Sequence, residues 1–325
     1  MHTYIFDKYG YLVDDEYTRE FEFKNWKFKL EANNKSELEL QELNMFITNV
    51  DNLLFNKGVR IITSKENRLS SDSEYGQLSL VAVNDFNVSI NDILQMHNKF
   101  LSSFSNDASP LLSSIKDLWI EKVEYIENKV VPSLKIDNYI YETAMVSIIH
   151  ALGLAENAID YINDISIDYG DKINEVTLVH KRLTSLNSYD LLNPFNLIVD
   201  SPMRDVSDLI KYEIINESDL DNILRNYNVD EQKASILLAR ILFPTKLFDL
   251  LEEHYELKKD IRKEILQYSK QIPKMMEKIS YIHNYLVNRY RIRPINWLLF
   301  KWGKNYEENS THICIIRNFI INYWL

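Results

Sequence analysis

Apolar and polar residues alternate with a period of two along two short runs in the first part of the chain, 19–23 and 26–30. Two further runs, 59–63 and 77–83, are also predicted to be strands. Only Lys24 and Asn25 separate the first two runs, which predicts an antiparallel hairpin closed by a two-residue turn. A polar loop over 64–75 is expected to join the last two runs. The pattern therefore predicts a small antiparallel sheet at the start of the chain.

Between the second and third runs the period changes to that of a helix. Ser36 is followed three residues later by Glu39, which is the spacing of a capping box at a helix N-terminus. An apolar face follows with helical spacing: Leu38, Leu40, Leu43, Phe46, Ile47 and Val50. Gly58 lies near the expected end of this helix. We therefore predict one main helix beside the sheet.

Helical periodicity dominates the chain after residue 84. Helices are predicted over 90–104, 115–130, 139–151, 154–162, 203–215, 231–255, 260–271 and 274–290. Pro244 and Pro273 are expected to break or kink this pattern, because proline lacks the amide donor of a helix interior. Val176–His180 is a short β-like run. The chain is therefore predicted to be α+β, with a small N-terminal lobe over 1–84 and a large, mainly helical lobe over 85–325.

The composition is that of a globular protein. The chain has 325 residues, of which 46% are hydrophobic, so it can bury the cores of two lobes. Its net charge is −11, whereas nucleic-acid binders carry clustered lysine and arginine, so no nucleic-acid partner is expected. One cysteine, Cys314, excludes an intrachain disulfide. No apolar run reaches membrane-spanning length. The apolar tail over 303–325 is expected to pack on the chain or on a partner, and the alternative is a contact with a membrane surface.

Five stretches, taken together with their order and spacing, resemble one family. They are 152–162 (LGLAENAIDYI), 179–184 (VHKRLT), 200–212 (DSPMRDVSDLIKY), 238–244 (LARILFP) and 294–298 (PINWL). They resemble the aminoglycoside-phosphotransferase-like superfamily, and within it the spore coat branch with its CotS and YutH types. The resemblance implies a two-lobed protein kinase-like fold. It also implies an origin in the mother-cell cytoplasm of a spore-forming bacterium, a place in the spore coat, and other spore coat proteins as partners.

An active kinase of that superfamily covers the nucleotide phosphates with a glycine-bearing turn. The resemblance places that turn at Lys24 and Asn25, where no glycine lets backbone amides approach a phosphate. An alternative register places the turn nearer Gly10.

A strand lysine also holds the phosphates in such a kinase, often paired with a helix glutamate. Lys29 could be that lysine, with Glu39 or Glu42 as its partner. The other interpretation of Lys29 is a solvated strand residue, since Lys27 shares its face of the strand. These three residues are the only cofactor-binding candidates, and they matter only if a nucleotide binds.

The catalytic segment of the superfamily, H-x-D-x-x-x-x-N, is matched at its first and last positions by His180 and Asn187. Arg182 stands where the base aspartate is expected, and an arginine cannot accept a proton. By the same resemblance, Asn193 stands where an aspartate would hold magnesium, which prefers anionic oxygen ligands. All four positions are therefore expected to form a degenerate site. Asp205 is expected to stabilise the backbone of this segment or to pair with a basic residue.

These replacements favour a non-catalytic pseudokinase with no cofactor, acting in sporulation or coat assembly as a scaffold or interaction protein. The first alternative is a divergent small-molecule phosphotransferase that uses ATP and Mg²⁺ with other carboxylates, such as Asp190 or Asp200. The second alternative is a regulator that binds a nucleotide through Lys29 without hydrolysing it.

Overall fold

The computed structural model describes residues 2–13, 19–74, 76–101, 103–104, 109–134 and 138–299. The chain divides into two compact units. The first joins Met1–Ser109 with Glu175–Ile214, and the second joins Pro110–Asn174 with Ile215–Leu325. The predicted lobe boundary at residue 84 stays a prediction, since these units group segments by packing. The predicted tail over 303–325 lies outside the described residues.

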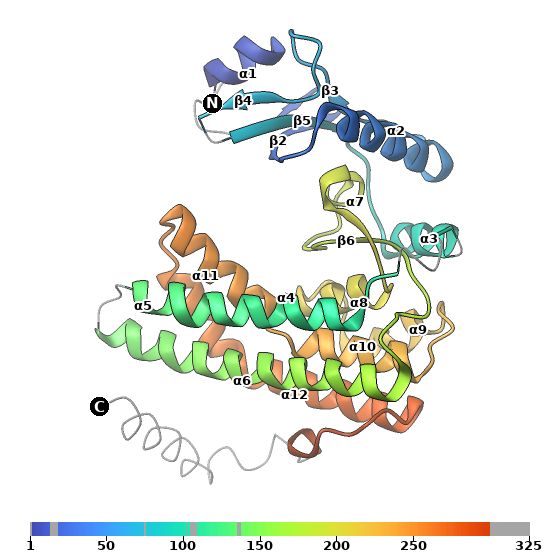
Figure 1. Ribbon diagram of the computed structural model, residues 1–325, viewed down its shortest axis with the longest axis vertical. Helices are drawn as coiled ribbons and strands as arrows, with labels where there is room; N and C mark the ends of the chain where they lie inside the picture. The colour runs from blue at the N-terminus through green and yellow to red at the C-terminus, as the bar shows by residue number, and fades with distance from the viewer. Residues whose placement is uncertain are drawn as a thin grey trace. The chain divides into compact units, whose positions relative to one another are not determined.

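The first unit contains the predicted antiparallel sheet (Figure 1). Its strands are β1 (Glu20–Phe23), β2 (Trp26–Ala32), β3 (Val59–Ile62), β4 (Ser71–Ser73) and β5 (Gly76–Asn84). They lie in the order β1-β2-β5-β3, and β4 also pairs with β5. The predicted hairpin is confirmed: Phe23 pairs with Trp26 across a two-residue turn, in which Lys24 has a φ of 55°. The sequence did not predict β4, because its three polar residues give no alternation.

The two faces of β2 have different environments. Phe28 and Leu30 belong to a buried cluster with Leu80 of β5 and with Ile5 and Tyr9 of helix α1 (His2–Tyr9). This helix was not predicted from the sequence. Because side chains alternate along a strand, Lys27, Lys29 and Glu31 lie on the opposite face of β2. The charged face of the hairpin is therefore available for contacts with other segments of the first unit.

Helix α2 (Glu37–Leu54) begins with the predicted capping box. The backbone amide of Ser36 donates to Oε2 of Glu39 at 2.7 Å, and the Glu39 amide donates back to the Ser36 hydroxyl. Leu40, Ile47 and Val50 bury the apolar face of the helix. The capping prediction is therefore confirmed in both of its hydrogen bonds.

The rest of the first unit surrounds a second, two-stranded antiparallel sheet. Its elements are α3 (Ile90–Phe100), β6 (Thr177–His180), α7 (Ser188–Leu192), β7 (Leu197–Asp200) and α8 (Met203–Lys211). Strands β6 and β7 pair with each other, with His180 opposite Leu197. The loop over 181–196 therefore connects β6 to β7 at one end of this sheet. It carries the predicted catalytic segment, which begins at His180.

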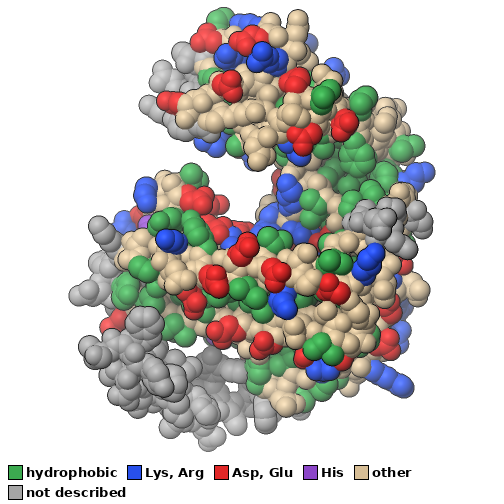
Figure 2. Space-filling view, in the orientation of Figure 1, with side chains coloured by type: hydrophobic (Ala, Val, Ile, Leu, Met, Phe, Trp, Pro, Cys, Tyr) green, Lys and Arg blue, Asp and Glu red, His purple; other side chains and the backbone are tan. Residues whose placement is uncertain are grey.

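The second unit is helical. Its main helices are α4 (Leu112–Tyr125), α6 (Asn138–Tyr169), α10 (Glu231–Leu242), α11 (Thr245–Leu257) and α12 (Arg262–Tyr290). Helices α4, α10 and α12 all pack against α6 (Figure 1). Acidic and basic side chains are interspersed over the face that Figure 2 shows. In the described part of the chain, no helix is long and apolar enough to cross a membrane.

Proline had different effects at its two predicted break points. The break at Pro244 is confirmed, since α10 ends at Leu242 and α11 begins at Thr245. The break at Pro273 is wrong, because α12 continues through it. Buried residues lie before and after Pro273 on one face, among them Tyr268 and Met276. Packing on both sides of the proline therefore holds the helix together despite the missing hydrogen bond.

Pro273→Ala is expected to raise the free energy of unfolding by about 1–2 kcal/mol. A proline inside a helix costs about 3 kcal/mol, and its restriction of the unfolded chain offsets part of that cost. Urea unfolding measures the change. Pro244→Ala is the matched control and should give no gain, because Pro244 lies at a true helix break. Equal gains in both variants would contradict the explanation.

Candidate functional site

One residue, Asn196, closes the loop over 181–196 at its base. The Lys181 amide donates to the Asn196 carbonyl at 2.6 Å, and the Arg182 amide donates to Oδ1 of Asn196 at 3.1 Å. Nδ2 of Asn196 donates to the Arg182 carbonyl at 2.8 Å. These three bonds extend the β6–β7 pairing past His180 and fix where the loop begins and ends.

A fully buried carboxylate, that of Asp205 in α8, bonds to two histidines. Its Oδ2 lies 2.6 Å from Nδ1 of His180 and 3.0 Å from Nε2 of His97 in α3. Nε2 of His180 lies 3.1 Å from the Leu191 carbonyl. Because both ring nitrogens of His180 face atoms that only accept hydrogen bonds, both carry protons. His180 and Asp205 therefore form a buried ion pair.

The pKa values of this pair agree with that assignment. Burial by itself would lower the pKa of His180 and raise that of Asp205, because it disfavours charge. The opposite charge and the shared hydrogen bond outweigh burial, so the pKa of His180 is raised and that of Asp205 is lowered. The pair therefore stabilises the fold while both groups are charged.

Two aspartates of α8 also hold the backbone of the loop. Oδ1 of Asp205 accepts the His180 amide at 2.9 Å, and Oδ2 of Asp208 accepts the Leu183 amide at 3.1 Å. Both carboxylates are buried. The expectation that Asp205 stabilises the loop backbone and pairs with a basic residue is thus confirmed.

Arg182 lies at the loop position where the resemblance places a catalytic base. Nη1 of its guanidinium donates to the Lys181 carbonyl at 2.9 Å. Its amide and carbonyl are both held by Asn196, so the backbone at this position is fixed. A group that is always protonated therefore occupies this position, and it cannot take a proton from a substrate hydroxyl.

Asn187 caps helix α7, and both atoms of its amide group form hydrogen bonds within the loop. Its Oδ1 accepts the Asp190 amide at 2.7 Å, and its Nδ2 donates to Oδ2 of Asp190 at 3.0 Å. The same carboxylate oxygen accepts the Ser185 hydroxyl at 2.7 Å. The side chains of Asn187 and Asp190 are therefore satisfied by each other and by the loop.

Asn193 connects the loop to strand β2. Its Oδ1 accepts the Phe195 amide at 3.0 Å, and its Nδ2 donates to Oε1 of Glu31 at 2.9 Å. The hydroxyl of Tyr189 donates to the same Glu31 oxygen at 2.8 Å. Burial, followed by the charge of Glu31, raises the pKa of Tyr189, so this hydroxyl stays protonated. Glu31 thus holds two side chains of the loop against the sheet.

The three predicted cofactor-binding residues do not come together. The ammonium group of Lys29 lies 5.5 Å from the centre of the Tyr189 ring, which is cation–π geometry. Glu39 is exposed and is held in the capping box of α2, and Glu42 is an exposed residue of the same helix. Sequence reasoning missed two residues at this place. Glu31 lies on the same face of β2 as Lys29, and Tyr189 of α7 contacts both of them.

The two predicted positions for a phosphate-covering turn have other surroundings. Lys24 is exposed, and its ammonium group lies 5.3 Å from the centre of the Phe23 ring. Gly10 follows α1 with a φ of 83°, and its amide donates to the Phe6 carbonyl, so this glycine ends a helix. Residues 14–18 lie outside the described residues.

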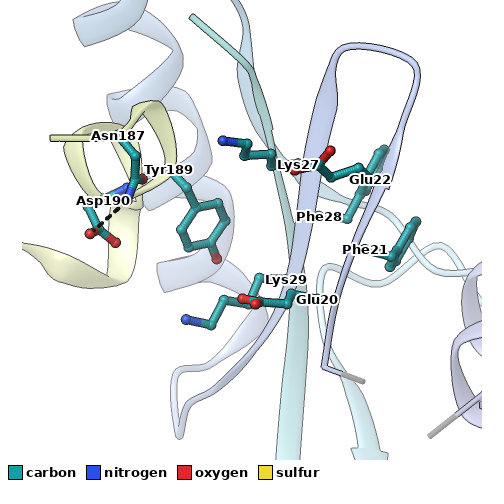
Figure 3. Close-up of a pocket in the computed structure, with 9 residues that line it drawn as sticks. All are labelled: Glu20, Phe21, Glu22, Lys27, Phe28, Lys29, Asn187, Tyr189 and Asp190. Carbon is teal, nitrogen blue, oxygen red and sulfur yellow. Dashed lines mark hydrogen bonds between the residues drawn. The ribbon is translucent and has the colours of Figure 1, made fainter. Parts of the chain in front are cut away.

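A pocket of about 480 Å³ lies between the charged face of the hairpin and α7 (Figure 3). It is lined by Glu20, Phe21, Glu22, Lys27, Phe28, Lys29, Asn187, Tyr189 and Asp190. In Figure 3, Lys27 and Lys29 extend from β2 toward α7, whereas Phe21 and Phe28 lie on the other side of the hairpin. Three carboxylates line the pocket against two ammonium groups, and Lys27 is paired with Asp85 at 3.0 Å. This charge balance disfavours the phosphates of a nucleotide.

The two alternative carboxylates are also engaged. Asp200 is buried, accepts the Ser201 amide at 2.6 Å and pairs with Nη1 of Arg204 at 2.9 Å. Asp190 is bound within the loop, as described above. Over the ranges that the structure describes, no three His, Cys, Asp or Glu side chains gather as metal ligands.

The fold is that of the protein kinase-like phosphotransferases. The structure of spectinomycin phosphotransferase APH(9)-Ia, in complex with ADP and spectinomycin, is similar with a TM-score of 0.51 and 11% identity, covering 89% of this chain and 97% of that one. An aminoglycoside phosphotransferase from Alicyclobacillus acidocaldarius has a TM-score of 0.45 at 10% identity, covering 84% and 92% of the two chains. A microcompartment-associated aminopropanol kinase has a TM-score of 0.40 at 8% identity, covering 81% and 86%. No curated protein sequence matches the chain.

The family is shown by sequence. The profile of the family described as "Spore coat putative kinase YutH" matches residues 3–288. The chain therefore belongs to this family, and the predicted resemblance and two-lobed kinase-like fold class are confirmed.

The buried ion pair makes a pH-dependent contribution to stability. The folded pKa of His180 is raised, so its contribution is complete below its ordinary value of about 6.5 and is lost as the pH rises through the folded value. The folded pKa of Asp205 is lowered, so its contribution is present above about 3.9 and is lost as the pH falls through the folded value. The pair is therefore expected to stabilise the fold most between about pH 4 and 6.5.

His180→Gln tests this expectation. The urea midpoints of the native chain and the variant should differ most at about pH 5.5, and the difference should shrink as the pH rises above about 6.5. His254→Gln is the matched control, because His254 bonds only to the backbone of its own helix end in the described contacts. If His180→Gln and His254→Gln shift the midpoint equally at every pH, the ion pair is not present.

Proposed function

We propose that this chain is a non-catalytic, kinase-like protein of the spore coat, which acts in sporulation or coat assembly as a scaffold or interaction protein. One observation carries the proposal: Arg182 occupies the position of the catalytic base, on a backbone held by Asn196. In kinases of this fold, an aspartate at this position orients the substrate hydroxyl and accepts its proton, and metal ions neutralise the phosphate charge. A guanidinium can do neither of these two things, because it is always protonated and cannot bind a metal ion.

The saturation of the loop supports the same proposal. Asn187 and Asn193, which the resemblance places at metal-binding positions, spend their amide oxygens on the helix-capping amides of Asp190 and Phe195. A metal ion at either oxygen would compete with the hydrogen bond that this oxygen already accepts. These side chains thus stabilise the conformation of the loop.

A divergent phosphotransferase that uses Asp190 or Asp200 is less well supported. Asp200 would have to give up Arg204, and Asp190 would have to give up the donors that hold α7. The acidic pocket beside Lys29 would also need a metal ion to accept phosphates. These costs favour the non-catalytic function.

The family description supports a place in the spore coat. We place the chain in the mother-cell cytoplasm during its synthesis and afterwards in the coat, with other spore coat proteins as partners. A fluorescent fusion in a sporulating bacterium should give a signal at the spore surface once the coat forms. A signal that stays diffuse in the mother cell after coat formation would contradict the assignment.

The absence of catalysis is tested by thermal unfolding with millimolar ATP, once with Mg²⁺ and once with EDTA. We expect no change in Tm that depends on Mg²⁺, because the two candidate metal-ligand amides are engaged. A second measurement follows phosphate release from ATP. A Mg²⁺-dependent shift, or a turnover that Asp200→Asn abolishes, would overturn the proposal.

A further inference from the structure

The last described residues are held against helix α12 by two hydrogen bonds. The Ile295 amide donates to Nε2 of His283 at 2.9 Å, and the Ser280 hydroxyl donates to the Leu298 carbonyl at 2.8 Å. His283 and Leu298 are fully buried, whereas Leu299, the last described residue, is 48% exposed. The chain therefore passes beyond the described residues at a fixed point next to Ser280.

A hollow of about 470 Å³ begins at the next residue of α12. It is lined by Tyr281, Asn284, Tyr285, Asn288 and Arg289, and we call this surface the α12 groove. Its residues follow one another at helical spacing, so they form a stripe about 12 Å long at 1.5 Å per residue. Tyr281 is 52% exposed, and Tyr285 contributes a second ring. The groove therefore offers aromatic surface together with amide and guanidinium donors.

The sequence beyond the described residues contains an apolar segment that such a groove can cover. Large apolar residues recur there at helical spacing: Ile313, Ile316, Ile320, Tyr323 and Trp324. Asn318 and Asn322 fall on the opposite side of the same pattern. The family profile ends at residue 288, before this segment. The pattern predicts an amphipathic segment over 313–325 whose apolar face needs a covering surface.

The connection between this segment and the groove is short. The 13 residues over 300–312 join Leu299 to Ile313, and an extended chain of that length spans about 40 Å. The groove begins one residue after Ser280, where the chain is anchored. A segment on so short a tether reaches a neighbouring surface at an effective concentration of about a millimolar. The segment therefore reaches the groove of its own chain more readily than that of a second copy present at about a micromolar.

We propose that the tail segment over 313–325 docks its apolar face in the α12 groove of the same chain. Tyr281 and Tyr285 supply aromatic surface for the apolar face, and Asn284, Asn288 and Arg289 bind polar groups at its rim. This interaction lies within the second unit, so it is independent of the loop that carries the predicted catalytic segment.

Cys314 provides the test, because it is the only cysteine of the chain and lies in this segment. Asn284→Cys and Asn288→Cys each place a second thiol in the α12 groove of the full chain. A short bismaleimide crosslinker is then added, and the products are identified by denaturing electrophoresis and by mass spectrometry of tryptic peptides. The expected product joins Cys314 to the introduced cysteine within one chain.

Asn128→Cys is the matched control, because Asn128 is an exposed asparagine of the same unit in η2 (Ile126–Val130). The product within one chain should be about tenfold more abundant in Asn288→Cys than in Asn128→Cys, because a docked tail holds Cys314 near the groove. Equal yields from these two variants, or no such product from either groove variant, overturn the proposal. Links that form only between two chains overturn it in favour of a second copy.

The apolar face is tested by Ile320→Asp in the Asn288→Cys background. A carboxylate on that face cannot be buried in the groove without a large cost, so the yield should fall to that of the control. Asn318→Asp adds the same charge on the opposite side and should leave the yield unchanged. Retained circular dichroism shows that the variants fold, and equal losses in both overturn the docking face. These measurements need neither ATP nor Mg²⁺, so their failure is distinguishable from a failure of the non-catalytic function.

Discussion

The buried carboxylate of Asp205 determines how the loop over 181–196 is held. It forms hydrogen bonds with the side chains of His97 and His180 and accepts one from the His180 amide, and so joins α3, β6 and α8 at one point. An unpaired carboxylate at this depth would be strongly destabilising. The second proton of His180 goes to the Leu191 carbonyl, which ties α7 to the same centre.

The polar side chains of the loop are largely engaged in hydrogen bonds that hold its backbone. Asn187, Asn193 and Asn196 each give their amide oxygen to a backbone donor within or beside the loop. In an active kinase of this fold, side chains at such positions must remain available to a metal ion. In this chain those atoms hold the backbone of the loop, which supports the proposed non-catalytic function.

Local features of the fold were predictable from the sequence, whereas contacts between distant residues were not. The hairpin and the capping box depend on residues two or three positions apart, and both were confirmed. The His180 and Arg182 positions came from the family resemblance. The contacts of Glu31 with Tyr189 and Asn193 join residues more than 150 positions apart, and no periodicity encodes them. Helix α12 continued through Pro273 because packing overrode a local rule.

The replacements at the loop also change the kind of ligand that the region can attract. A base aspartate and a metal-binding aspartate would make it negative and suited to a divalent cation. Arg182 and Asn193 do not supply that negative charge, and the nearby carboxylate of Asp200 pairs with Arg204. The charge of these two side chains, rather than the backbone that carries them, therefore underlies the proposed loss of catalysis.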